Sequence, residues 1–287
     1  MSIFNIRDFS SNNNYTQYIE TLKVITPLLL TFNESSNIKR SLKKLFWAKR
    51  IVVIDSYSTD NTLEILESYS TVEVLQREFD THTNQWNYGL EQVNTEWVLS
   101  LDADYVLSDH LIKELKGICF DSNTDGYFIP FKYCIFGKPL RGSILPPRQA
   151  LFRKSKSVYV DDGHTQLLQV AGHCQHLKNH IFHDDRKALS RWLWAQDRYM
   201  IIEAKKLVET PVAELSFVDR IRKHKLFAPF IVFFYCLIVK GGIFDGWAGW
   251  YYAFQRMLAE TLLSLKIIEL DNLDAFGTIE KEESFTS

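Results

Sequence analysis

The sequence predicts an α/β fold in which a mainly parallel β-sheet is followed by a helical C-terminal region. Two observations carry this prediction. Between residues 23 and 120, short β-rich apolar runs alternate with helical patterns and polar turns, which is typical of βαβ units. After His183, the segment RKALSRWLWAQDRYMIIEAKKLVE has apolar residues at helix-like spacing.

Four strands and three intervening helices are expected in the first part of the chain. The strands are VITPLLLTF, RIVVID, VEVLQ and EWVLSLD, and the helices run through SNIKRSLKKLF, TDNTLEILESY and TNQWNYGLEQV. Because helical crossovers join these strands, we expect a sheet that is mainly parallel and buried on both faces. From residue 126 to 183 shorter extended pieces, such as YFIPFKYCIFG and QALFRK, predict a small mixed sheet.

The composition argues against several classes of protein. With 46% hydrophobic and 24% charged residues, a chain of 287 residues can bury a sizeable core. The net charge of −2 lacks the basic excess that a nucleic-acid partner demands. The four cysteines are scattered and form no C-x-x-C pair, which favours a reducing compartment. Polar residues near the N-terminus predict no export signal, so we expect a cytoplasmic protein.

Polar residues gather where the four predicted strands end. In open parallel sheets, ligands bind beyond the carboxyl ends of the strands, where the loops carry the polar groups. The residues at these ends are Thr31, Asn33 and Glu34, then Asp55, Ser58 and Asp60, then Arg77, and finally Asp102 and Asp104. We therefore expect the functional site at this edge of the sheet.

The segment WVLSLDADY places two carboxylates, Asp102 and Asp104, two residues apart at a strand end. Both can turn toward one divalent cation, and Mg²⁺ or Mn²⁺ prefers oxygen ligands and also binds substrate phosphates. Such a cation neutralises charge on a departing nucleotide diphosphate. Alternatively, the two aspartates only end the strand and cap a helix that begins near Ser108. The polar segments at the first two strand ends favour the metal site.

The segments TFNESSNIKRSL, VVIDSYSTDNT, NQWNYGL and EWVLSLDADY resemble the N-terminal half of family 2 inverting glycosyltransferases. Later segments, namely ALFRK, DDGHTQ, LKNHIFH and IFDGWAGW, are similar to bacterial lipopolysaccharide-core glucosyltransferases. The resemblance covers about residues 23–255. It implies a GT-A-type, Rossmann-like fold.

The expected domain organisation follows from these patterns. We expect an N-terminal tail over residues 1–22 and a catalytic domain over residues 23–185. Its nucleotide-binding half is residues 23–120 and its acceptor half is residues 121–185. A helical region over residues 186–270 and a tail over residues 271–287 complete the chain.

The resemblance implies roles for individual residues. Thr31, Phe32, Asn33 and Glu34 line the nucleotide base and ribose, Asp55 accepts a hydrogen bond from uracil, and Asp102 and Asp104 hold ribose and metal. Ser58 belongs to the same binding loop, Arg77 can pair with a phosphate, and Asn84, Gln85 and Asn87 can reach the nucleotide. The alternatives are helix caps or turns for the polar residues, a core position for Phe32, and an exposed ion pair for Arg77.

Two positions depart from the family pattern. Trp86 stands where an arginine is common between Gln and Asn, and Tyr105 stands where an acidic residue often follows D-A-D. The diphosphate contacts are the part of the site that these departures affect.

An inverting transfer needs a base that takes the proton of the acceptor hydroxyl. The segment VDDGHTQ offers three candidates: Asp162 as the first choice, Asp161 as the second, and His164 as a base or an acceptor-orienting group. The alternative for this segment is an Asp-Gly turn.

Histidines cluster in GHCQHLKNHIFHDD, which contains His173, Cys174, His176, His180 and His183. Their spacing lacks the paired ligands of structural zinc sites. By resemblance, His183 alone reaches the metal or diphosphate beside D-x-D. Otherwise it is a helix cap or a surface histidine.

Residues 226–239, LFAPFIVFFYCLIV, contain no charge but are shorter than the ~20 residues that span a bilayer. Flanking cations and the aromatic segment WAGWYYAF suit a membrane interface. We expect an in-plane or re-entrant anchor on the cytoplasmic face of the inner membrane. The alternative is a helical hairpin buried in the core or in a homo-oligomer interface.

The sequence thus predicts an inverting hexosyltransferase that uses a nucleotide sugar, with UDP-hexose expected, and Mg²⁺ or Mn²⁺. The acceptor would be a glycan or a lipid-linked glycan in cell-envelope polysaccharide biosynthesis. A nucleotidyltransferase is the first alternative, although it would carry a Gly-rich loop after the first strand, where this chain has TFNESSN. A non-catalytic, membrane-associated scaffold that binds nucleotide is the second.

Overall fold

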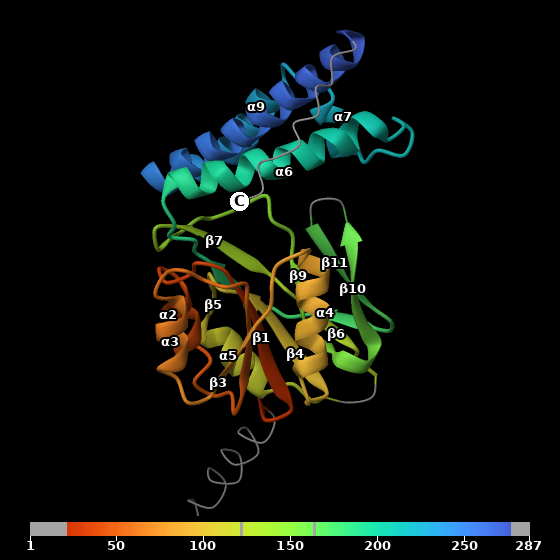
Figure 1. Ribbon diagram of the computed structural model, residues 1–287. Helices are drawn as coiled ribbons and strands as arrows, with labels where there is room; N and C mark the ends of the chain where they lie inside the picture. Colours follow the sequence, from red (N-terminus) through yellow and green to blue (C-terminus); the bar gives the residue numbers. More distant parts are fainter. Residues whose placement is uncertain (1–21, 121–122, 163–164, 277–287) are drawn as a thin grey trace, which may run out of the picture. The chain divides into compact units, whose positions relative to one another are not determined.

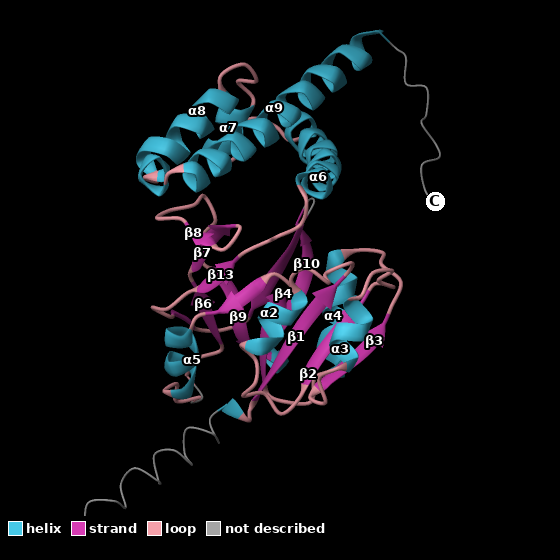
Figure 2. Cartoon of the chain, turned by 90° about the vertical axis from the view of Figure 1, so that its left-hand side faces the viewer, coloured by secondary structure: helices cyan, strands magenta, loops and turns pink. Residues whose placement is uncertain are grey.

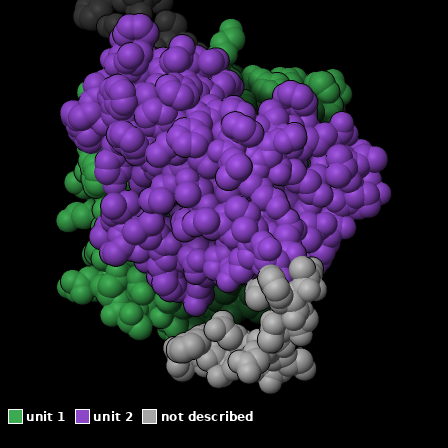
Figure 3. All heavy atoms as spheres, turned by 90° about the horizontal axis from the view of Figure 1, so that it is seen from above, with its two compact units in different colours: residues 1–139, 145–186 green, residues 140–144, 187–287 purple. Residues whose placement is uncertain are grey.

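The computed structural model describes residues 22–120, 123–162 and 165–276. The chain divides into two compact units, one of residues 1–139 with 145–186 and one of residues 140–144 with 187–287 (Figure 3). Strands lie in the first unit and long helices in the second (Figure 2). We call them the sheet unit and the helical unit.

The central sheet of the sheet unit has seven strands in the order β12-β6-β9-β4-β1-β2-β3. The four predicted strands are β1, β2, β3 and β4, and they run parallel to one another (Figure 1). Strand β9 lies between β4 and β6 and is antiparallel to both. The bounds are β1 Ile25–Thr31, β2 Ile51–Asp55, β3 Val72–Gln76, β4 Trp97–Asp102, β6 Gly126–Ile129, β9 Arg148–Arg153 and β12 Cys174–His176.

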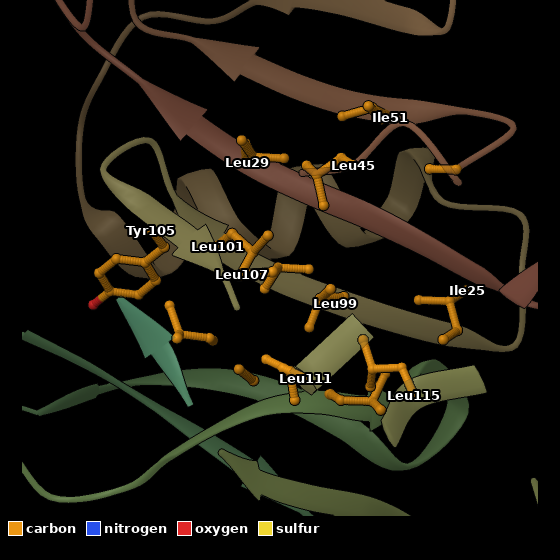
Figure 4. Close-up of a cluster of buried hydrophobic side chains, with 14 of the residues drawn as sticks. Ile25, Leu29, Leu45, Ile51, Leu99, Leu101, Tyr105, Leu107, Leu111 and Leu115 are labelled. Carbon is orange, nitrogen blue, oxygen red and sulfur yellow. The ribbon is translucent and has the colours of Figure 1, made fainter. Parts of the chain in front are cut away.

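Helices cover both faces of this sheet because its central strands are apolar on both sides. Alternate residues of β1 separate accordingly: Leu28 packs in the cluster of α4 (His82–Gln92), whereas Leu29 packs in the cluster of α2, α3 and α5. These three helices are α2 Ile38–Lys43, α3 Thr62–Glu67 and α5 Asp109–Lys116. Figure 4 shows Leu29, Leu99 and Leu111 in the second cluster.

The strands between residues 126 and 183 do not form the single small sheet that the sequence predicts. Three of its strands, β6, β9 and β12, join the central sheet. The reason is burial: Ala150, Leu151 and Phe152 of β9 are fully buried and need cover on both faces. Of the other strands in this range, β13, β7 and β8 join the earlier strand β5 in a four-stranded sheet, β5-β13-β7-β8, and β10 and β11 form a hairpin. The remaining bounds are β5 Tyr105–Leu107, β7 Phe131–Ile135, β8 Lys138–Pro139, η1 Lys154–Lys156, β10 Ser157–Asp162, β11 Thr165–Val170 and β13 Ile181–His183.

The helical unit is built on two long helices that lie side by side in Figures 1 and 2. Met200, Ala204 and Leu207 of α6 pack against Leu263 and Ile267 of α9. The elements are α6 Leu189–Glu209, α7 Phe217–Arg222, α8 Ala228–Phe234, the π-helical turn η2 Tyr235–Val239, the 3₁₀ turn η3 Gly242–Asp245 and α9 Trp247–Phe276. Within the described residues, no helix combines the length and apolar composition that crossing a bilayer requires.

Gly89 of α4 provides a test of the contact between this helix and the sheet. A Cβ atom at Gly89 would lie 2.8 Å from Cδ1 of Leu28 and 3.2 Å from Cγ1 of Ile54, both in the core. Gly89→Ala should therefore lower the free energy of unfolding by about 1–3 kcal/mol, because the packed core must shift. Urea unfolding measures the change.

Gly117→Ala is the matched control. This glycine follows the last residue of α5 as its C-cap, has a negative φ of −91° and is exposed. A new Cβ there would lie 3.4 Å from the nearest atom, the carbonyl oxygen of Glu114. Its free energy of unfolding should stay within about 1 kcal/mol of the parent. Equal losses in both variants would contradict the close approach of α4 to the sheet.

Candidate active site

The carboxylate of Asp55 joins the ends of the first two strands. Thr31 and Asp55 are register partners, and the Thr31 hydroxyl donates to Oδ1 of Asp55 over 2.8 Å. The Ser58 backbone N–H donates to Oδ2 over 2.8 Å, and the Ser58 hydroxyl donates to Oδ1 over 2.5 Å. Asp55 is fully buried. It therefore holds the loop after β2 in place, and a direct bond from uracil to Asp55 stays a prediction.

Asn33 connects the loops after β1 and β2. Its φ of 54° lies in the left-handed region, which asparagine tolerates better than most residues. The Asn33 side-chain oxygen accepts from the Thr59 N–H over 2.8 Å, and its own N–H donates to the Ser58 hydroxyl over 2.9 Å. Glu34 follows, and its N–H donates to the Thr62 hydroxyl over 2.8 Å. The two motif segments thus form one rigid edge.

Phe32 does not occupy the core, because 40% of it is exposed at this edge. Tyr57, in the loop after β2, is 55% exposed and has a φ of 59°. Both aromatic side chains stand beside the Asn33 network. They offer apolar surface at the carboxyl ends of β1 and β2.

Arg77 and Asn84 both contact Asp80. Arg77 donates from both terminal nitrogens to the two Asp80 oxygens, over 2.8 and 2.9 Å. Asn84 donates to Asp80 over 2.8 Å, and Gln85 accepts from Arg77 over 2.7 Å. The hydrogen bond from Arg77 holds the pKa of Asp80 well below its usual range. The ion pair expected as the alternative for Arg77 is thus present, and its contact with a phosphate stays a prediction.

Asn87 anchors the β10-β11 hairpin to α4. Its amide nitrogen donates to the Tyr159 carbonyl over 2.9 Å, and its oxygen accepts from the Tyr159 N–H over 3.0 Å. The Tyr159 ring also stacks on Trp86, with centroids 5.3 Å apart. Both polar groups of the Asn87 side chain are therefore engaged with β10.

Strand pairing places His183 beside Asp104. Strand β13 pairs antiparallel with β5, so His183 lies opposite Tyr105, the residue after Asp104. Nε2 of His183 lies 3.0 Å from Oδ2 of Asp104. Burial lowers the pKa of His183, but the nearby carboxylates of Asp104, Asp102 and Asp185 together raise the pKa above its usual value. His183 is thus neither a helix cap nor a surface residue.

Asp102 pairs with Arg148, which the sequence alone did not single out. Nη1 of Arg148 lies 2.9 Å from Oδ2 of Asp102 and 3.1 Å from the Tyr105 hydroxyl. Burial lowers the pKa of Arg148, but Asp102 and Tyr105 raise it overall. The guanidinium also lies 5.9 Å from the ring centroid of Trp86. Trp86 and Tyr105, the two departures from the family pattern, therefore both contact Arg148.

The predicted base residues lie on or after β10. Asp161 is exposed, and strand alternation places it on the same face as Tyr159. Asp162 ends β10, and its backbone pairs with Thr165 of β11. The side chain of Asp162 and the whole of His164 lie outside the described residues.

The donor atoms of Asp104 and His183 suit two ligands of one cation. Neighbouring ligands of octahedral Mg²⁺ at ~2.1 Å lie about 3 Å apart, and Oδ2 and Nε2 are 3.0 Å apart. Nδ1 of His183 is buried with no hydrogen-bond partner among the described residues. In the same ranges no group of three or more His, Cys, Asp or Glu side chains has the arrangement of a metal site. A cation here would complete its shell with phosphate oxygens and water.

The sequence profile described as glycosyl transferase family 2 matches residues 28–170 of the 287. This range runs from β1 through β11 and includes Asp102, Asp104 and Arg148. The chain belongs to glycosyl transferase family 2. The family 2 resemblance predicted from the four motif segments is confirmed.

Similar proteins match a part of the chain. An uncharacterized glycosyltransferase of Rickettsia bellii is 31% identical over 106 residues, which are 37% of this chain and 36% of that protein. A poly-beta-1,6-N-acetyl-D-glucosamine synthase of Staphylococcus aureus is 30% identical over 107 residues, 34% of this chain and 26% of that protein. The match thus spans well under two thirds of either relative. Among solved structures, S. aureus TarS 1-349 in complex with UDP-GlcNAc has a TM-score of 0.47 and 16% identity, covering 90% of this chain and 93% of that chain.

A double-mutant cycle on Arg148→Met and Asp102→Asn tests the ion pair at the end of β4. The coupling energy should be about 1 kcal/mol in urea unfolding, because Arg148 is three-quarters buried while 40% of the Asp102 side chain is exposed. The matched control is the exposed pair Arg50 and Glu73, mutated to Met and Gln. Its coupling should stay below about 0.5 kcal/mol. Additive losses at Arg148 and Asp102 would contradict the pairing.

Proposed function

We propose that the chain is an inverting glycosyltransferase that moves a hexose from a UDP-sugar to a glycan or lipid-linked glycan of the cell envelope. The observation that carries the proposal is the position of Asp102 at the end of β4 and of Asp104 two residues later, with His183 beside Asp104. Family 2 membership supports the transferase class. The relative named as a synthase of an N-acetylglucosamine polymer supports a glycan acceptor.

The donor nucleotide fits the edge built by the loops after β1 and β2. Phe32 and Tyr57 are exposed there and can cover the faces of a base and ribose. Asn33 and Glu34 form part of the same edge, while Thr31 and Ser58 are held by the buried Asp55. We assign Asp55 the positioning of these two hydroxyls, and Asp102 the contact with the ribose.

Mg²⁺ or Mn²⁺ would be held by Asp104 and His183, and it would neutralise the charge that develops on the departing UDP. Arg148 supplies a second, permanent positive charge, because a guanidinium stays protonated at any working pH. Its hydrogen bond to Asp102 fixes the direction of that carboxylate. Together these residues would stabilise the negative charge that develops on the diphosphate as the bond between the anomeric carbon and the phosphate oxygen breaks.

The acceptor oxygen attacks the anomeric carbon from the face opposite UDP, and a carboxylate takes its proton. Asp161 shares a strand face with Tyr159, whose ring stacks on Trp86 beside Arg148. This placement favours Asp161 as the base that takes the proton, and Asp162, at the end of β10, is the alternative. After transfer, the base returns its proton to solvent.

Asp104→Asn and His183→Gln should each lower divalent-dependent sugar transfer by about 100-fold or more, because each removes a ligand for the cation. Asn is used because the Asp104 side chain is only 14% exposed, so a truncation would also leave a gap. The assay follows UDP release and coupled sugar transfer while Mg²⁺ or Mn²⁺ is titrated. Pyrophosphate release in place of UDP would instead indicate a nucleotidyltransferase.

Asp109→Asn is the matched control for these variants. Asp109 lies on α5, its side chain is 79% exposed, and it pairs with Lys44 over 2.7 Å. Transfer should stay within about twofold of the parent, since an exposed ion pair contributes little to stability. Parent-like turnover in both Asp104→Asn and His183→Gln would overturn the proposed metal site.

Asp161→Asn and Asp162→Asn distinguish the two candidate bases. Loss of the base should lower kcat by about 10²–10⁴-fold with little change in the affinity for UDP, because the base acts on the acceptor. The other variant should keep most of its activity. Full activity in both variants would exclude a base on β10.

A further inference from the structure

Residues 227–239 form a helical segment with apolar side chains on two opposite sides. Ala228 of α8 and Cys236 and Leu237 of η2 are buried within the helical unit. The opposite side carries Phe230, Phe234 and Ile238, which are 59%, 54% and 66% exposed. A helix with one face toward water normally has polar residues on that face. This segment therefore lacks the polar face that solvent favours.

The exposed apolar surface continues onto α9. The Phe233 ring lies 5.2 Å from Phe254 and 6.1 Å from Trp250, measured between centroids. Trp250 and Phe254 are 41% and 50% exposed, and Phe244 of η3 is 71% exposed. We define the apolar face as Phe230, Phe234, Ile238, Phe244, Trp250 and Phe254. A contiguous exposed surface of this kind marks an interaction site.

Basic residues outnumber acidic ones in the segment that carries most of the apolar face, although Arg141, Arg222 and Lys225 pair with acidic residues of the same unit. From residue 220 to 244 the chain has five lysines and arginines and no aspartate or glutamate. Lys240 Nζ lies 5.4 Å from the ring centroid of Tyr235, and the Arg141 guanidinium lies 5.3 Å from that of Phe244. Both cations thus lie against aromatic rings beside the apolar face. Long basic side chains placed this way keep their stems on apolar surface and their charge in water.

We propose that the apolar face inserts into the interfacial layer of a bilayer that contains anionic lipid. Aromatic rings and aliphatic side chains would enter the boundary between headgroups and acyl chains, and Lys240 would bind the anionic headgroups. The inference goes beyond the proposed reaction, because it uses none of the residues of the sheet unit.

Two features favour a membrane surface over other occupants. Residues 226–239 would extend only about 21 Å as a helix, less than the ~30 Å hydrocarbon core, so an in-plane position fits better than a crossing. A second copy related by twofold symmetry would bring the basic residues of both chains together. Arg222 and Lys225 pair with acidic residues of the same unit, so the repulsion would come from the basic residues nearest the apolar face, Lys240 among them.

Vesicle flotation of the full chain tests the proposal. The parent should float with vesicles of phosphatidylglycerol and phosphatidylethanolamine, and at least fivefold less with pure phosphatidylcholine. The triple variant Phe230→Ser, Phe234→Ser and Ile238→Ser should lower the bound fraction at least tenfold. Lys240→Gln should weaken binding to the anionic vesicles only. Circular dichroism and thermal unfolding check that each variant is folded.

Val212→Ser with Phe217→Ser is the matched control, because both residues are exposed in the same unit, by 57% and 77%, but outside the apolar face. This double variant should float like the parent. Asp104→Asn should do so too, which separates a failure of this inference from a failure of the proposed reaction. Parent-like flotation of the triple variant would overturn the inference. So would a lipid-free dimer, seen by analytical ultracentrifugation, that the triple substitution dissociates.

Discussion

The antiparallel pairing of β9 with β4 determines the electrostatics of the site. In this pairing Leu99 lies opposite Leu151, so the residue three positions after Leu99 comes beside the residue three positions before Leu151. These two residues are Asp102 and Arg148, and their side chains are 2.9 Å apart. Leu151 packs in one buried cluster and Phe152 in the other, so a slip of one residue would exchange the faces of these side chains and disrupt both clusters. Core packing thus holds the register that keeps a cation beside Asp102.

The two aspartates of the D-A-D segment have different partners. Asp102 contacts a permanent cation, whereas Asp104 contacts a histidine that β13 carries to it. Residues two apart in a strand face the same side, but β4 ends at Asp102 and a turn leads to β5, so Asp104 is not bound by this alternation. The two carboxylates therefore have different surroundings: Arg148 orients Asp102, and Asp104 contacts His183.

The helices and loops around these residues are organised by buried polar contacts. Asp55 is fully buried yet accepts from Thr31 and Ser58, so the desolvation of its charge is offset by hydrogen bonds. Asn87 similarly uses both of its polar groups to hold β10. Residues that the sequence suggests as ligand contacts can thus form hydrogen bonds that hold the protein's own loops and strands. The exposed side chains beside them, such as Phe32, remain available to a ligand.

The sequence by itself determined the parallel strands β1 to β4, the helices between them, the family, and the edge of the sheet at which the polar residues gather. These features depend on local periodicity and on residues close together in the chain, which sequence patterns record directly. Only the tertiary structure decided that β9 joins the central sheet and that Arg148 reaches Asp102. It also decided which side of residues 227–239 is exposed. Such features depend on pairings between distant segments, and no local pattern encodes the register of an antiparallel strand that arrives about fifty residues later.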